Sequence, residues 1–239
     1  MSNYDLSIII PAYQEEKRLP DSLNKLEYFL FQTNLDIEII IVVEDLSDNT
    51  FGIAKEFAET HDNIVVLLNE QRMGKGYSVK RGVLAATAPI IGFIDADFSF
   101  NIVDILDYYQ IIKDNKAECV IPLKIQDKTV PFYRSITSSV FRRARKLIVG
   151  INVHDTQSGF KVFSSEFVRN VFPRVATDGF AFDIDVLAWG ETLGYRIKEL
   201  PTIFGHNGDS KVSFVKDSID MFKHLFTVRK NINKYKNIN

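Results

Sequence analysis

The chain has 239 residues, is 46% hydrophobic, and balances 29 lysines and arginines against 31 aspartates and glutamates. This length is enough for one large α/β domain, and the charge balance gives no sign of nucleic-acid binding or of an oligomeric state. The single cysteine, Cys119, excludes an intrachain disulfide and a cysteine-based metal site. The first apolar run is short, and no run approaches the roughly 20 residues that span a bilayer, so we expect a cytoplasmic protein, peripheral to a membrane.

Strand and helix patterns alternate through the first half of the chain. Short β-branched runs predict buried strands at Leu6–Ile10, where Pro11 stops the run, and at Ile37–Val43, Ile64–Leu68 and Ile90–Ile94. Apolar residues at helical spacing predict intervening helices at Asp21–Phe31, Thr50–Thr60 and Tyr77–Ala86. Such alternation is typical of a parallel, doubly wound sheet.

Charged clusters follow several of these strands, at the sheet edge where α/β proteins bind ligands. Asp95 and Asp97 come directly after Ile90–Ile94. Alone, this pair also fits a solvated turn. Two close carboxylates repel each other unless a cation or a proton offsets their charge, and oxygen ligands suit Mg²⁺ or Mn²⁺ bound together with phosphates. Asp45 would accept from a base or ribose, and Lys75, between two glycines, would meet phosphate. We therefore expect a nucleotide, although the dinucleotide fingerprint and the P-loop are missing.

The second half of the chain has fewer strand signals and more basic residues. The pattern predicts a helix at Ile102–Lys113, a strand at Glu118–Leu123, and an edge strand that follows Gly194 and ends at Pro201. Phe132–Val149 mixes apolar residues with arginines, and Val215–Arg229 reads as an amphipathic helix before a basic tail. These segments fit solvated surface helices or helices on an anionic membrane surface, with Arg142, Arg143 and Arg145 toward the headgroups.

Several motifs resemble those of the family 2 glycosyltransferases. The first half has Ile-Pro-Ala-Tyr-Gln-Glu at 10–15, Val-Val-Glu-Asp-Leu-Ser at 42–47, Gly-Lys-Gly at 74–76 and Asp-Ala-Asp at 95–97. The blocks at 155–163, 182–187 and 210–212 resemble the dolichyl-phosphate and polyprenyl-phosphate glucosyl- and mannosyltransferases. The resemblance implies a GT-A fold, a Rossmann-like, mainly parallel α/β sheet flanked by helices. We expect one domain over 1–239, with a nucleotide-sugar half (1–100), an acceptor half (101–213) and an amphipathic helix with a basic tail (214–239).

The resemblance also implies roles for individual residues. The nucleotide sugar would be held by residues at the strand ends: Pro11, Ala12, Tyr13, Glu15, Glu44, Asp45, Lys75, Asp95 and Ala96. The metal would be held mainly by Asp97, with Asp95 shared between the metal and ribose. The acceptor phosphate would be held by Lys124, Arg134, Ser138 and Lys211. Asp97, Arg134 and Asp155 are the residues expected to act in catalysis.

The implied activity is transfer of a hexose, with inversion, from a nucleoside-diphosphate sugar to a polyprenyl phosphate, with UDP and glucose favoured. A phosphate acceptor has a second pKa of about 6 and needs no strong base, so Arg134 and Lys124 would orient it with Asp155 in support. A saccharide or protein hydroxyl acceptor would instead require Asp155 or Asp183 as the base. A non-catalytic nucleotide-sugar-binding module is the remaining alternative. At least one of Asp183 and Asp185 is expected to be structural.

Overall fold

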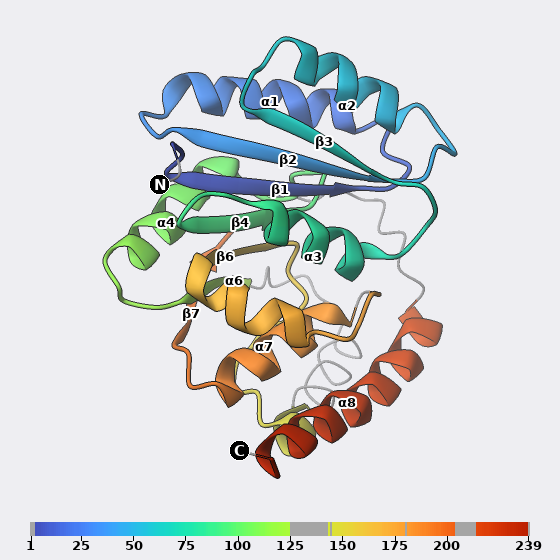
Figure 1. Ribbon diagram of the computed structural model, residues 1–239, viewed down its shortest axis with the longest axis vertical. Coiled ribbons are helices and arrows are strands. Elements are labelled where there is room, and N and C mark those ends of the chain that lie inside the picture. The colour runs from blue at the N-terminus through green and yellow to red at the C-terminus, as the bar shows by residue number, and fades with distance from the viewer. Residues whose placement is uncertain (1–2, 125–142, 144, 180, 204–213, 239) are drawn as a thin grey trace.

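One central sheet organises the computed structural model, which describes residues 3–124, 143, 145–179, 181–203 and 214–238. Seven strands lie in the order β3-β2-β1-β4-β6-β5-β7 (Figure 1). They are β1 (Leu6–Ala12), β2 (Ile37–Glu44), β3 (Ile64–Asn69), β4 (Ile90–Ile94), β5 (Cys119–Lys124), β6 (Phe160–Ser164) and β7 (Ile197–Thr202). Only β6 runs antiparallel to its neighbours, which are β4 and β5. The predicted mainly parallel α/β sheet is therefore confirmed.

Helices cover both faces of this sheet. They are α1 (Leu19–Gln32), α2 (Thr50–Glu59), α3 (Lys75–Ala85), α4 (Ile105–Lys113), α6 (Ser165–Val171), α7 (Phe182–Thr192) and α8 (Phe214–Lys236), with 3₁₀ turns at Ile102–Asp104 and Phe172–Arg174. The four helices predicted between Asp21 and Lys113 are all present. The amphipathic helix predicted at Val215–Arg229 is also present and extends to Lys236. Of the segment Phe132–Val149, residues 143 and 145–149 are described, and they are helical.

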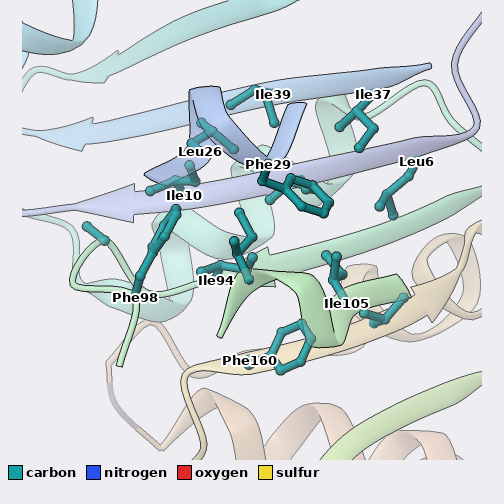
Figure 2. Close-up of a cluster of buried hydrophobic side chains, with 14 of the residues drawn as sticks. Leu6, Ile10, Leu26, Phe29, Ile37, Ile39, Ile94, Phe98, Ile105 and Phe160 are labelled. Atoms are coloured by element: carbon teal, nitrogen blue, oxygen red, sulfur yellow. The ribbon is translucent and has the colours of Figure 1, made fainter. Parts of the chain in front are cut away.

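The alternation of side chains along the strands builds two apolar layers. Leu6, Ile8 and Ile10 of β1 face the layer that contains α1, α2 and α4. Figure 2 shows Leu6 and Ile10 in this layer, with Leu26 and Phe29 of α1. Ile9 of β1 faces the layer formed with α3, α6, α7 and α8. Both layers are buried, and each fully buried large aliphatic side chain contributes roughly 1.5–3 kcal/mol. Helices therefore pack on both faces of the sheet, and this packing fixes the position of the edge at which the parallel strands end.

The prediction that Pro11 stops the first strand is wrong, because β1 continues through Pro11 to Ala12. Pro11 pairs with Val42 of β2, whereas the pairing of β1 with β4 ends at Ile9. One side of β1 therefore has no ladder partner at Pro11, and a residue without an N–H is accommodated there. The predicted edge strand is confirmed as β7, but the prediction that it ends at Pro201 is wrong, because β7 includes Pro201 and ends at Thr202.

Within the ranges that the structure describes, no helix combines the length and the apolar composition that crossing a bilayer requires.

Candidate functional site

The carboxyl ends of β1, β2 and β4 turn sharply at the same edge of the sheet. Gln14, Asp45 and Phe98 follow these strands, and their φ values of 52°, 57° and 42° lie in the left-handed region. This backbone conformation is unfavourable for residues other than glycine, and such strain gathers at ligand sites. The three turns bring together the loops that carry most of the predicted nucleotide-sugar residues.

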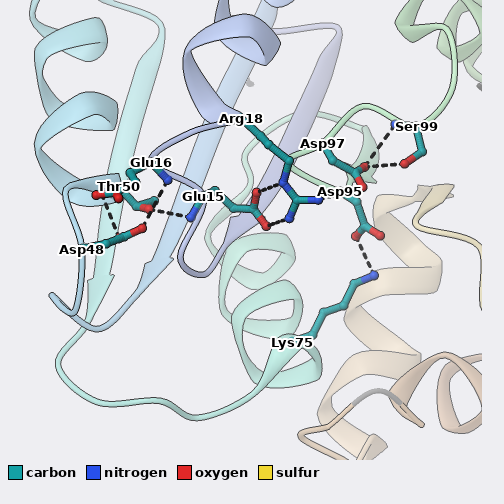
Figure 3. Close-up of polar contacts among 9 residues, drawn as sticks. All are labelled: Glu15, Glu16, Arg18, Asp48, Thr50, Lys75, Asp95, Asp97 and Ser99. Atoms are coloured by element: carbon teal, nitrogen blue, oxygen red, sulfur yellow. Dashed lines mark hydrogen bonds and ion pairs between the residues drawn. The ribbon is translucent and has the colours of Figure 1, made fainter. Parts of the chain in front are cut away.

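The two carboxylates after β4 each lie near a cationic side chain (Figure 3). The ammonium of Lys75 lies 2.5 Å from Oδ1 of Asp95, and the guanidinium of Arg18 lies 3.8 Å from Oδ2 of Asp97. Ser99 donates hydrogen bonds from its backbone N and its hydroxyl to Oδ1 of Asp97, at 3.1 and 2.7 Å. Ser99 therefore orients Asp97, and the acidic pair is offset by charges from α3 and from the loop before α1.

Lys75 is the first residue of α3, which begins earlier than the predicted Tyr77. The two flanking glycines are explained by a neighbouring segment of this chain. A Cβ on Gly76 would lie 2.7 Å from the carbonyl oxygen of Thr177, and one on Gly74 would lie 2.6 Å from that of Asp178. Gly74 also has a φ of +101°. The loop at 177–179 thus packs against the start of α3 and holds Lys75 toward the acidic pair.

The electrostatic surroundings keep Lys75 protonated. Burial alone would lower the pKa of its ammonium, but the carboxylates of Asp95 and Asp183 outweigh burial and raise it above 10.5. Lys75 is therefore a fixed positive charge at neutral pH, next to the carboxylates and available to an incoming phosphate.

A buried ion pair lies behind Lys75. Nζ of Lys161 on β6 lies 2.6 Å from Oδ1 of Asp183 on α7, and it also donates to the carbonyl of Ser158 at 2.7 Å. Both side chains are almost completely buried. Burial raises the pKa of Asp183, with Lys161 and Lys75 acting in the opposite direction. Asp183 is thus engaged inside the protein and cannot reach a substrate hydroxyl as a base.

Asp185 is also buried and has a structural role. Its Oδ2 accepts hydrogen bonds from the backbone N of Ala176 and of Thr177, at 2.8 and 3.2 Å. These contacts hold the chain just before the loop that packs on α3. Both aspartates of the 182–187 block are therefore structural, which answers the question that the sequence left open between Asp183 and Asp185.

The block at 155–163 is joined directly to the acidic pair. The backbone N of Asp95 donates to the carbonyl of Gly159 at 2.8 Å. A Cβ on Gly159 would lie 1.9 Å from Oδ2 of Asp95, so only glycine fits there without moving the carboxylate. Asp155 lies four residues earlier, and its Oδ1 accepts from the backbone N of Gln157 at 3.0 Å. Its catalytic role stays a prediction.

The nucleotide side of the edge is formed by the loops after β1, β2 and β3. Glu15 binds Arg18 through both carboxylate oxygens, at 2.6 and 2.5 Å. Its backbone N donates to Oγ1 of Thr50 at 2.8 Å, which ties the loop after β1 to the start of α2. The guanidinium of Arg72, after β3, stacks over the ring of Tyr13 at 4.5 Å from its centroid. These contacts hold the loop that carries Tyr13 and Glu15 against the loop after β3 and the start of α2.

The other residues predicted to bind the nucleotide sugar differ in how exposed they are at this edge of the sheet. Pro11 and Ala12 form the end of β1, Ala96 is buried between the two aspartates, and Asp45 is partly exposed. Glu44 is buried, and its Oε1 accepts from the hydroxyl of Ser78 at 2.7 Å, because the last residue of β2 points beneath α3. Its carboxylate therefore supports α3 from inside, and the predicted contact of that side chain with a ligand stays a prediction.

The acceptor-phosphate residues are only partly within the described ranges. Lys124 is exposed at the end of β5. Arg134, Ser138 and Lys211 lie outside the described residues, and so does Arg142. The predicted roles of these side chains in binding the acceptor phosphate stay predictions.

Arg145 does not face a membrane, so that part of the membrane prediction is wrong. Its guanidinium is buried and donates to Oγ1 of Thr156 at 2.7 Å and to the carbonyl of Val153. The short helix at 145–149 places this side chain on its inner side, where the carbonyl oxygens of Val153 and His154 accept hydrogen bonds from its guanidinium. Arg145 thus anchors the loop that carries Asp155.

Several residues of the site were not predicted from the sequence. Arg18 and Arg72 lie in loops without a recognisable motif, so only the fold brings them to the edge. Gly159 and Lys161 lie inside the quoted block at 155–163. Gly159 follows the polar residues 155–158, and a glycine at such a position is a signal that another group approaches the backbone closely.

The donor atoms at this edge fit a hard divalent cation. Within the described ranges, no group of three or more His, Cys, Asp or Glu side chains comes together, so the carboxylates of Asp95 and Asp97 form a pair. Mg²⁺ and Mn²⁺ are commonly bound through one or two carboxylates, with substrate phosphates and water at the remaining positions. The two cationic side chains beside the pair show that positive charge is already favoured there.

Comparisons with known proteins agree with this geometry. Residues 7–172 match the family model described as "Glycosyl transferase family 2". The chain is 29% identical to a dolichyl-phosphate beta-glucosyltransferase of Dictyostelium discoideum, over 96% of this chain and 75% of that protein. A Drosophila melanogaster protein of the same name is 27% identical, over 94% of this chain and 74% of that protein.

A solved structure has the same fold. The crystal structure of glucosyl-3-phosphoglycerate synthase from Mycobacterium tuberculosis in complex with UDP superposes with a TM-score of 0.71 at 16% identity, covering 97% of this chain and 81% of that chain. The same enzyme is also solved with Mn²⁺, UDP and glucosyl-3-phosphoglycerate. The fold is the predicted GT-A fold.

Proposed function

The chain belongs to glycosyl transferase family 2, and we propose that it transfers glucose from UDP-glucose to a polyprenyl phosphate, with inversion at the anomeric carbon. The observation that carries this proposal is the pair Asp95 and Asp97 at the end of β4, braced by Lys75 and joined through Gly159 to the 155–163 block. A charged, pre-arranged edge of this kind suits a diphosphate leaving group. The names of the dolichyl-phosphate relatives support glucose and the lipid phosphate.

Asp97 and Asp95 would hold Mg²⁺ or Mn²⁺ together with the donor diphosphate. Bound there, the cation would offset the negative charge that develops on the departing nucleotide. In the free protein Lys75 neutralises Asp95, and its ammonium lies close enough to the pair to bind a diphosphate oxygen instead. Ser99 and Arg18 keep the Asp97 carboxylate oriented. On donor binding, the ion pair between Lys75 and Asp95 would thus be replaced by contacts of Lys75 with the diphosphate and of Asp95 with the cation.

The burial of Asp183 favours a phosphate acceptor over a hydroxyl acceptor. Asp183, one of the two candidate bases, is buried and paired with Lys161. A phosphate monoester has a second pKa of about 6 and is a nucleophile at neutral pH without a base. Lys124, Arg134, Ser138 and Lys211 are the residues we propose to hold it. Asp155, anchored through Arg145 and Thr156, would support this arrangement.

Two-phase extraction separates the acceptor classes. The protein is incubated with Mn²⁺, UDP-[¹⁴C]glucose and a short-chain polyprenyl phosphate, and in parallel with the matching polyprenol and with saccharide acceptors. We expect label in the organic phase with the phosphate only, and none for Asp97→Asn. Label transferred to a saccharide but never to polyprenyl phosphate would instead support the hydroxyl-acceptor enzyme. UDP release without metal would remove the proposed metal role.

The donor is tested separately by thermal shift. A ligand that binds only the folded protein raises the melting temperature by mass action. With Mn²⁺ present, UDP and UDP-glucose should stabilise the protein more than GDP and GDP-mannose at equal concentration. A larger shift with the guanine nucleotides would reverse the proposed choice of base.

A further inference from the structure

A basic and apolar surface lies away from the candidate active site, on α8 and the short helix at 145–149. The two helices lie side by side: the guanidinium of Arg229 donates to the carbonyls of Leu147 and Ile148 at 3.4 and 3.2 Å. In Figure 1 the short helix lies beside the C-terminal end of α8, at the bottom of the view. Because these contacts join them, the two helices form one surface.

The inner side of α8 between residues 224 and 236, where its side chains are described, packs on the domain. Leu225, Val228 and Ile232 are buried, and Tyr235 makes an edge-on ring contact with Trp189 of α7 at 5.4 Å. These positions recur every three or four residues and define the face of α8 that is fixed to the domain. The opposite face of the described part of α8 is therefore directed outward.

That outward face combines large apolar side chains with lysines. On α8, Phe226, Lys230 and Lys234 follow one another at intervals of four residues and form a stripe, and Ile238 lies in the turn after the helix ends at Lys236. Phe226 and Ile238 are 61% and 72% exposed, and Leu147 on the neighbouring helix is 81% exposed. Apolar tips among cationic side chains are unfavourable in water alone, but they match a lipid interface.

The charge of this surface has one sign. The described stretches 143, 145–154 and 224–238 contain no Asp or Glu, and Arg143, Lys146, Lys230 and Lys234 are exposed on them. No ion pair between these four side chains and a carboxylate occurs within the described part of the chain. A surface of this charge is complementary to an anionic bilayer, where each lysine or arginine is attracted to the headgroups.

We propose that this surface, formed by Lys146, Leu147, Phe226, Lys230, Lys234 and Ile238, docks the protein on an anionic phospholipid bilayer. The same short helix anchors the 153–156 loop through Arg145, so docking would fix the Asp155 loop relative to the lipid headgroups. This consequence for the acceptor rests on the proposed function; the docking itself does not.

Vesicle flotation tests the docking. The full chain is mixed with vesicles of phosphatidylcholine alone, or of phosphatidylcholine with about one third phosphatidylglycerol. We expect binding to the anionic vesicles that weakens with salt, and a partition coefficient about 100-fold lower for Lys146→Gln/Lys230→Gln/Lys234→Gln. Leu147→Ser/Phe226→Ser should remove the part of the binding that persists at high salt.

A matched control has the same change in charge elsewhere. Lys25, Lys55 and Lys113 are exposed on α1, α2 and α4, the helices of the other sheet face. Lys25→Gln/Lys55→Gln/Lys113→Gln should bind anionic vesicles as the unmodified protein does. Equal loss in this control, equal binding to both kinds of vesicle, or no binding to either would overturn the proposal.

Transfer assays separate this inference from the proposed function. With a water-soluble short-chain polyprenyl phosphate, the surface variants should keep the unmodified rate, and with the acceptor embedded in anionic vesicles they should lose it. If no variant and not even the unmodified chain uses any polyprenyl phosphate, the proposed function fails, while the flotation result still decides whether the surface docks on a membrane.

Discussion

Replacing Gly159 with alanine tests how tightly the site is arranged around Asp95. The new Cβ would lie 1.9 Å from Oδ2 and 2.3 Å from Cγ of Asp95, whereas real Cβ contacts do not come below 3.0 Å. The carboxylate must therefore move by about 1 Å or more, which takes it from the 2.5 Å contact with Lys75. A displacement of about 1 Å in a positioned catalytic group can lower the rate about 100-fold.

The stability of the Gly159→Ala variant should change much less than its activity. Crowding of this kind costs roughly 1–3 kcal/mol, or a few degrees of melting temperature in a chain of this size. We expect glucosyl transfer at saturating substrates to fall about 100-fold, together with weaker Mn²⁺ binding by calorimetry. Steady-state transfer, calorimetry and thermal melting are measured on the same preparation.

Gly179→Ala is the matched control, because a Cβ there meets nothing within 4 Å and its φ is not in the left-handed region. This control should keep the unmodified rate. If Gly159→Ala also kept the unmodified rate and Mn²⁺ affinity, Asp95 would not need its present position, and a pre-arranged acidic pair would be refuted.

Three further predictions follow from the same contacts. Asp97→Asn should lower steady-state transfer at least about 100-fold, because the charge that holds the cation is removed while the shape is kept; unchanged transfer would contradict the metal role. Lys161→Met leaves Asp183 buried without its partner and should lower the free energy of unfolding by about 3–5 kcal/mol in urea, most of which Lys161→Met/Asp183→Leu should restore. The raised pKa of Lys75 means that its contribution to stability is complete below 10.5 and is lost as the pH rises through the higher folded-state value. The stability difference between the unmodified chain and Lys75→Met should therefore be constant from neutral pH to about 10, and a decrease within that range would show that the ammonium is not held charged.

The first half of the fold was predictable because its signals are local. Each strand from β1 to β4 is a short β-branched run, and each intervening helix shows an apolar stripe, so period and element type agree. The acidic pair and Lys75 could be assigned to one edge because parallel strands present their carboxyl ends on the same side. The error at Pro11 arose because the extent of pairing with β4 depends on a strand that lies about 80 residues later in the chain.

The second half was less predictable because its elements are defined by contacts. Nine of the eleven residues of α7 are buried, so no polar face reveals its helical period. β6 inserts antiparallel between β4 and β5, an order that no local pattern specifies. Arg145 and Lys161 are of residue types that usually lie at the surface, yet both are buried, because their partners come from segments that only the folded chain brings together.

The product formed from UDP-glucose and a short-chain polyprenyl phosphate decides whether this protein is an inverting glucosyltransferase with a phosphate acceptor. Mass spectrometry and NMR of the organic-phase material should identify a polyprenyl phosphate joined to glucose through a β-configured glycosyl phosphate bond, because attack by the phosphate oxygen inverts the α-linkage of the donor. An α-linked product would contradict inversion at the anomeric carbon. Free glucose as the sole product, or glucose joined to a hydroxyl, would contradict a phosphate acceptor.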